Sequence, residues 1–208
     1  MKIINYKKKI YYNSLFVNLV KFATPVILFF LKTRLVNVTG RIPQKGPLLI
    51  AAHHEELADH YLIALQTKRK LFWVADTTPF GKSLADSKLI RWILVRLGAI
   101  PIDKRNSERN VNLFSHLLYL LEKGQAIVFF PESYVRYERD GNKFGSFKDG
   151  VIRLSKKYQS LYKKPIPILP IGLCYKRQKS VKTVSLNIGN PQINPAKAKL
   201  FQSIKNLS

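Results

Sequence analysis

Short apolar runs that alternate with helix-like segments constrain the fold of this chain more than any other feature. Five runs have the length and composition of buried strands, and they are residues 47–52, 71–75, 99–102, 126–130 and 166–173. Four segments between them have apolar residues at helical spacing, and they are residues 59–67, 88–97, 111–122 and 147–158. Strands alternating with helices form a largely parallel or mixed sheet flanked by helices. We therefore predict an α/β fold, with the alternating residues 181–188 as an edge strand.

The N-terminal part of the chain is basic and then apolar. No acidic residue occurs before Glu55, and the apolar stretch at 15–31 is broken by Lys21 and Pro25. A membrane-spanning helix needs about 20 mostly apolar residues. Here the longest run of that stretch without a charged residue is 22–31, and no small-residue cleavage site marks a secretory signal. This composition favours a helix that lies in the membrane interface, with its lysines toward the headgroups.

We accordingly predict a membrane-associated helical segment over residues 1–36 and a single domain over residues 37–208. Two alternatives stay open for the segment: a helix that spans the bilayer, and a helical hairpin packed on the domain. The sequence contains no internal repeat and no low-complexity linker that would divide the rest of the chain.

The charge of the chain indicates an acidic partner. Lys and Arg number 36 against 12 for Asp and Glu, which gives a formal net charge of +24. Anionic lipid, nucleic acid, or an acidic protein or cofactor would each fit this charge, and a solvated basic surface is the alternative. The basic residues are scattered and no nucleic-acid-reading module is recognisable, so we expect no nucleic-acid partner.

The single cysteine, Cys174, lies in the apolar run 169–175, where we expect it to be buried. One cysteine excludes an intramolecular disulfide framework and suits a protein that faces a reducing, cytoplasmic-type compartment.

Polar residues suited to acid–base chemistry directly follow the strand at 47–52. Residues 53–60 read His-His-Glu-Glu-Leu-Ala-Asp-His, at the end of a strand where α/β folds place ligand-binding loops. A metal site is one interpretation, but the helical zinc signature would need a histidine where Ala58 stands. The other is an acid–base pair of His54 and Asp59. On one continuous helix the two side chains would point in different directions. They can meet if His54 lies in the loop before the helix.

Such a pair has a known chemical use. A carboxylate that accepts from Nδ1–H of a histidine fixes the tautomer whose Nε2 can take a proton. No Ser or Cys nucleophile is needed if the substrate supplies the hydroxyl. A histidine and an aspartate that merely tie a loop together are the structural alternative.

Three further blocks follow in order along the chain. They are Gly98-Ala99-Ile100-Pro101-Ile102-Asp103-Lys104-Arg105, Phe129-Phe130-Pro131-Glu132 with Gly145-Ser146-Phe147-Lys148-Asp149-Gly150, and Ile166-Pro167-Ile168-Leu169-Pro170-Ile171-Gly172. Together with His54 and Asp59 they resemble the glycerolipid acyltransferase family, typified by lysophosphatidic acid acyltransferase. The resemblance covers roughly residues 40–175.

The resemblance implies a role for each matching residue. His54 corresponds to the general base and Asp59 to its orienting partner. Lys104 stands where the family has an arginine that binds the acceptor's phosphate, and Arg105 can share this task. Glu132 corresponds to a carboxylate that positions the acceptor.

Some positions depart from the family pattern. His53 replaces an asparagine before the catalytic histidine, and Glu56 replaces a small hydroxyl residue. After Glu132, residues 133–136 read Ser-Tyr-Val-Arg instead of Gly-Thr-Arg-Ser, so Arg136 is displaced by one residue from the family's arginine. From its charge and position we expect Arg136 to join Lys104 and Arg105 in binding phosphate. The departures touch the acceptor site rather than the catalytic pair.

The resemblance implies transfer of a fatty acyl group from acyl-carrier protein or coenzyme A to a lysophospholipid hydroxyl, such as that of 1-acylglycerol-3-phosphate. It also implies that the acyl group would pass directly between the substrates at a membrane. We expect that membrane to be anionic, and we expect no metal and no tightly held cofactor. Two alternatives remain: an inactive or divergent membrane-surface protein of the same fold, and an acyltransferase with another hydroxyl or an amine acceptor.

Overall fold

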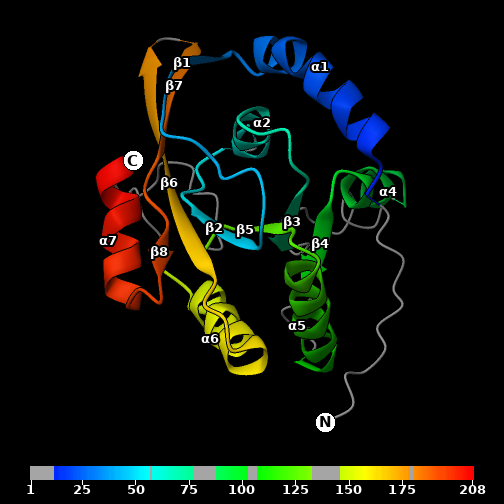
Figure 1. Ribbon diagram of the computed structural model, residues 1–208. Coiled ribbons are helices and arrows are strands. Elements are labelled where there is room, and N and C mark those ends of the chain that lie inside the picture. The colour runs from blue at the N-terminus through cyan, green and yellow to red at the C-terminus, as the bar shows by residue number, and fades with distance from the viewer. Residues whose placement is uncertain (1–11, 57, 77–87, 103–106, 133–145, 179) are drawn as a thin grey trace.

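The computed structural model describes residues 12–56, 58–76, 88–102, 107–132, 146–178 and 180–208. Within these residues, eight strands form one sheet with helices on both faces (Figure 1). The strands are β1 (Thr33–Thr39), β2 (Leu48–Ala52), β3 (Leu71–Asp76), β4 (Ala99–Ile102), β5 (Ala126–Phe129), β6 (Pro167–Gln178), β7 (Val181–Ile188) and β8 (Gln192–Ile193). The helices are α1 (Ser14–Phe30), α2 (Asp59–Leu65), α4 (Lys88–Arg96), α5 (Ser107–Glu122), α6 (Gly150–Tyr162) and α7 (Lys197–Leu207).

The sheet is mixed, and β2 lies at its centre. The strand order is β1-β7-β6-β2-β5-β3-β4, with β8 paired to β6. β2 runs parallel to both of its neighbours, β5 and β6, whereas β6 pairs antiparallel with β7 and β8. The carboxyl ends of β2, β5 and β6 therefore meet at the same edge of the sheet.

Alternate residues of β2 supply the two hydrophobic cores. Leu48 and Ile50 pack on the face that α1 and α2 cover, whereas Leu49 and Ala51 pack on the face that α5, α6 and α7 cover. Figure 1 shows α1 and α2 on one side of the sheet and α5 and α6 on the other. All five residues of β2 are buried, as expected of a strand covered on both faces. The predicted α/β fold, with a mixed sheet flanked by helices, is confirmed.

One strand prediction is wrong. Residues 181–188 were expected at an edge, but β7 lies between β1 and β6, and β1 forms the edge. The alternation along β7 reflects a sheet face that is partly exposed, not an unpaired edge. β1 was not among the predicted strands, and its residues pair in parallel with β7. The boundary expected after residue 36 thus falls inside β1.

The helix α1 packs on the domain through one face. Its buried residues are Val17, Thr24 and Leu28. Lys21 donates from Nζ to the backbone oxygen of Thr67, 2.7 Å away beyond the end of α2. This lysine thus bonds a carbonyl of the domain, and the placement of the helix at a membrane stays a prediction.

The opposite face of α1 is apolar and exposed. The exposed side chains include Leu15, Leu19, Phe22, Val26, Phe29 and Phe30. Among the helices that the structure describes, none is long and apolar enough to cross a membrane. Cys174, expected to be buried, is partly exposed in β6.

Candidate active site

The loop between β2 and α2 brings His54 and Asp59 together. His54 lies in the loop, and Asp59 is the first residue of α2. Nδ1 of His54 is 2.9 Å from Oδ2 of Asp59. The two side chains thus meet in the arrangement expected from the sequence. Their catalytic roles stay a prediction.

Asp59 is fully buried and accepts hydrogen bonds on both carboxylate oxygens. Besides His54, Oδ2 accepts from the backbone N–H groups of Glu55 at 2.8 Å and Glu56 at 2.9 Å. Oδ1 accepts from the hydroxyl of Tyr175 in β6. Burial, and then the charge of Asp59, raise the pKa of Tyr175, which keeps its hydroxyl a donor. A buried charge with this many donors, at a helix N-terminus, is well compensated.

Aromatic rings fix the plane of the His54 imidazole. The ring stacks on Phe130, just after β5, with centroids 4.1 Å apart and an interplanar angle of 28°. His60 meets the same imidazole edge-on at 5.2 Å and lies 5.0 Å from Trp73 of β3. The hydrogen bond to Asp59 and the contact with Phe130 together leave the ring little freedom to turn.

The preceding residue, His53, is buried between two carboxylates. Its Nδ1 is 2.8 Å from Oε1 of Glu132, and its Nε2 is 3.8 Å from Oε2 of Glu55. Burial lowers the pKa of His53, but the hydrogen bonds and charges of Glu132 and Glu55 outweigh it and raise the pKa to about 9. His53 is therefore a cation at neutral pH.

Two cations of the β6–β7 hairpin hold the outer part of the loop. Arg177 and Lys182 face each other across the hairpin. Both bond Oε1 of Glu56, at 3.0 Å and 2.8 Å, and Arg177 also lies 3.3 Å from Glu55. These contacts tie the loop to the sheet on the side opposite Glu132.

The structure places only part of the predicted acceptor site. Glu132 is buried just after β5, beside the loop between β2 and α2. The proposed phosphate ligands Lys104, Arg105 and Arg136 lie outside the described residues. Among the residues that are described, no group of three or more His, Cys, Asp or Glu side chains could hold a metal ion.

Sequence reasoning missed the supporting residues Tyr175, Phe130 and Arg177. A signal existed for Tyr175, because a tyrosine in a buried strand requires a partner for its hydroxyl. Neither Phe130 nor Arg177 carries such a signal, because their contacts depend on how β5 and the β6–β7 hairpin lie against the loop.

A family model described as Acyltransferase matches residues 35–174. The chain is 25% identical over 125 residues to the chloroplastic 1-acyl-sn-glycerol-3-phosphate acyltransferase LPAT1 of Arabidopsis thaliana. This match covers 59% of this chain and 33% of that protein. It is 23% identical over 144 residues to the chloroplastic 1-acyl-sn-glycerol-3-phosphate acyltransferase BAT2 of Brassica napus. This match covers 69% of this chain and 38% of that protein. The chain thus spans little more than a third of the length of these plant proteins.

The fold also resembles a solved structure. The crystal structure of the 1-acyl-sn-glycerophosphate acyltransferase PlsC from Thermotoga maritima superposes with a TM-score of 0.63. The match covers 91% of this chain and 75% of that one, with 18% sequence identity. At this identity the likeness supports the shared fold.

Proposed function

This chain belongs to the Acyltransferase family, and from that premise we propose that it is a glycerolipid O-acyltransferase. The proposed donor is a fatty acyl thioester of acyl-carrier protein or coenzyme A. The proposed acceptor is a hydroxyl of a lysophospholipid, with 1-acylglycerol-3-phosphate as the first candidate, because the plant relatives are named for that substrate. Such a reaction belongs to phospholipid biosynthesis.

The hydrogen bond between His54 and Asp59 carries this proposal. Because Asp59 accepts from Nδ1 of His54, Nε2 is the nitrogen with the lone pair. His54 can therefore take the proton of an acceptor hydroxyl as its oxygen attacks the thioester carbonyl. The carbon–oxygen bond forms, the carbon–sulfur bond breaks, and the thiolate can receive the proton from His54. Each step uses groups of the chain and the two substrates, so the proposal includes no metal and no tightly held cofactor.

Asp59 supports the proton transfer without moving. Its other hydrogen bonds, from two backbone N–H groups and Tyr175, hold the carboxylate in place. A fixed negative charge beside Nδ1 stabilises the imidazolium that forms when His54 takes the proton. Because these donors are already oriented, little reorganisation is needed during the reaction.

The acceptor's phosphate is proposed to bind Lys104, Arg105 and Arg136, with Glu132 nearby. The guanidinium groups can bond phosphate oxygens with paired hydrogen bonds, and Lys104 adds a point charge. The described position of Glu132, beside the loop of His54, supports an acceptor site at this sheet edge.

We propose that the exposed apolar face of α1 contacts an anionic membrane. Phe22 is 86% exposed and Leu15 is 80% exposed, and large apolar side chains that share one helix face mark an interaction surface. The inner face of α1 packs on the domain and hydrogen-bonds Thr67 through Lys21. Lipid contact would thus hold the domain close to the bilayer, on a reducing, cytoplasmic-type face.

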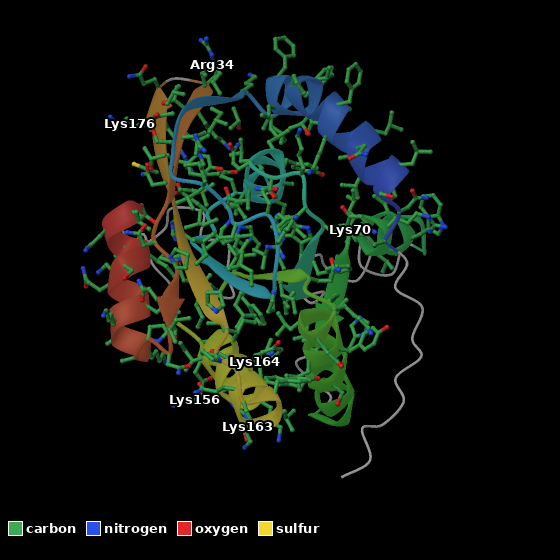
Figure 2. All side chains as sticks on the ribbon, in the orientation of Figure 1. Arg34, Lys70, Lys156, Lys163, Lys164 and Lys176 are labelled. Carbon is green, nitrogen blue, oxygen red and sulfur yellow. The ribbon has the colours of Figure 1, made fainter. Side chains whose placement is uncertain are left out.

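The apolar face, rather than charge, defines the lipid-facing side. Figure 2 shows Arg34 on β1 and Lys176 on β6, whereas Lys156 on α6 and Lys163 and Lys164 just after that helix lie on the other side of the sheet from α1. Exposed cations therefore occur on both sides of the molecule, while the large apolar side chains of α1 occupy one.

Purified full-length protein on anionic vesicles would test the proposed reaction. Acyl-carrier protein and coenzyme A thioesters are each crossed with lysophosphatidate, lysophosphatidylcholine and monoacylglycerol. Free thiol and acylated lipid are measured together, and His54→Ala provides the blank. We expect both products with lysophosphatidate and wild-type protein. No acylated lipid with any donor and acceptor would overturn the proposed function.

A further inference from the structure

His53 occupies a buried position where two parts of the site meet. Its backbone N–H donates to the oxygen of Ile171 at 3.0 Å, which completes the last pair of β2 with β6, Ala52 and Ile171. Its side chain is 2% exposed and turns toward Glu132, which follows β5. The next residue, His54, turns its side chain toward Asp59 instead. The proposed base, His54, and the residue that contacts Glu132, His53, are thus adjacent in the chain.

The contact between His53 and Glu132 is short and shielded from solvent. The distance from Nδ1 to Oε1 is 2.8 Å, and the Glu132 side chain is 1% exposed. A carboxylate at this depth is costly unless an opposite charge or several donors compensate it. An imidazolium supplies both a donor and a charge, and charge-assisted bonds of this length are strong.

Other charged groups around His53 keep it protonated. Glu55 approaches its second ring nitrogen at 3.8 Å. Glu55 in turn contacts Arg177 of β6, and Glu56 contacts Arg177 and Lys182 of β7. These cations oppose the charge on His53 but lie beyond the two glutamates. Although burial lowers the pKa of His53, the two carboxylates raise it to about 9, so the cation persists at neutral pH.

We propose that His53 is a positioning residue for the acceptor: its imidazole holds Glu132 against the loop that carries His54. This inference rests on the proposed function, in which Glu132 positions the lysophospholipid. The contact between His53 and Glu132 joins the end of β5 to the end of β2, beside the stacking of His54 on Phe130. An asparagine here, as in the family pattern, could donate a hydrogen bond but could not supply a charge.

Kinetics of two neutral variants would test the role. His53→Asn retains a donor near the position of Nδ1, and His53→Leu removes it. We expect His53→Leu to raise KM for the lysophospholipid by about 10- to 100-fold, the loss typical of one charge-assisted hydrogen bond. KM for the thioester should stay within about twofold, because Glu132 is assigned to the acceptor. His53→Asn should lie between the wild type and His53→Leu.

A double-mutant cycle with Glu132→Gln would show whether the two residues act as one unit. If they do, His53→Leu combined with Glu132→Gln should be little worse than Glu132→Gln alone. Independent, multiplicative losses, or a rise in KM for both substrates alike, would overturn the positioning role.

An NMR titration of the His53 ring would test the pair without relying on activity or on a stable His53 variant. In full-length wild-type protein we expect its midpoint near pH 9, and in Glu132→Gln a clearly lower midpoint. A wild-type midpoint near the ordinary value of 6.5 would overturn the inference. If the ring titrates near 9 but the vesicle assay yields no acylated lipid, the pair stands and the proposed function fails, so the two failures are distinguishable.

Discussion

The hydroxyl of Tyr175 donates to Oδ1 of Asp59, the oxygen that does not face His54. Tyr175 belongs to β6, and Asp59 begins α2, so the bond crosses from the sheet to the helix that covers it. It prevents the carboxylate from rotating about its own axis. The orientation of the His54 ring therefore depends on a strand that contributes no proposed catalytic residue.

Tyr175→Phe should lower kcat and stability together. The variant keeps the ring but leaves Oδ1 of Asp59 without this donor, a loss that costs about 1–3 kcal/mol for a buried polar group. We expect kcat to fall by about tenfold, because Asp59 can turn away from His54. Thiol release and urea unfolding measure the two effects. Tyr162→Phe, which removes an exposed bond to Glu122, should change neither.

His54→Ala should abolish transfer and leave folding and vesicle binding intact. Asp59→Asn should reduce kcat by roughly 10²- to 10⁴-fold, the range of a general base. The double variant should be little worse than His54→Ala, since the two residues act as one unit. Circular dichroism and thiol release would be compared on the same samples. Near-normal transfer by His54→Ala would end the assignment of the base.

Lys104→Ala combined with Arg105→Ala should weaken a phosphorylated acceptor selectively. We expect a higher KM for lysophosphatidate and little change for monoacylglycerol, because the lost cations are proposed to bind phosphate. Arg136→Ala should have a smaller effect in the same direction. An equal loss on both acceptors would refute a dedicated phosphate site.

The central strand and the contact between His54 and Asp59 could be predicted from the sequence because their signals are local. Residues 47–52 form one apolar run, and His54 and Asp59 stand within the same short loop and helix start. The bond from His53 to Glu132 joins residues 79 positions apart. Nothing in either local segment reveals that contact, because it depends on the pairing of β2 with β5.

The misplaced edge strand has a similar cause. The alternation of apolar and polar residues along 181–188 correctly indicated a strand with one face more buried than the other. It does not indicate whether another strand pairs on each side. β1 supplied the missing neighbour, although most of its residues are exposed and its sequence includes Arg34 and Asn37. Its stability as a strand comes from the parallel pairing with β7 rather than from burial.

Phe22→Ser combined with Phe29→Ser should weaken vesicle binding without unfolding the domain. Both side chains are exposed on α1, and burying one phenylalanine in an apolar phase is worth about 1.5–3 kcal/mol. We expect at least about tenfold weaker co-sedimentation with anionic vesicles. Deleting residues 1–34 should also reduce binding, but it removes Val17 and Leu28 from the packed face of the helix.

Leu161→Ser on α6 provides the matched control for these substitutions. Its side chain is also exposed, but it belongs to the helices on the other face of the sheet, so vesicle binding should not change. High salt should release the wild type only in part, because apolar contact is not screened. Full release by salt would show a purely electrostatic contact, and equal binding by the double Phe variant would contradict a role for this face.

The stability of the folded chain should fall as pH rises from 6.5 to 9 because of His53. The pKa of this residue is about 9 in the folded chain and 6.5 in its ordinary state. Below pH 6.5 the His53 ring is charged in both the folded and the unfolded chain, so its full contribution to the free energy of unfolding is present. Between the two values the unfolded chain has lost the proton that the folded chain keeps, so roughly 3 kcal/mol is lost as pH rises through this range. Urea unfolding at a series of pH values measures this loss, and subtracting the curve of His53→Asn removes the contribution of other groups. If the difference in unfolding free energy between the wild type and His53→Asn does not change between pH 6.5 and 9, Glu132 and Glu55 do not hold the proton on His53.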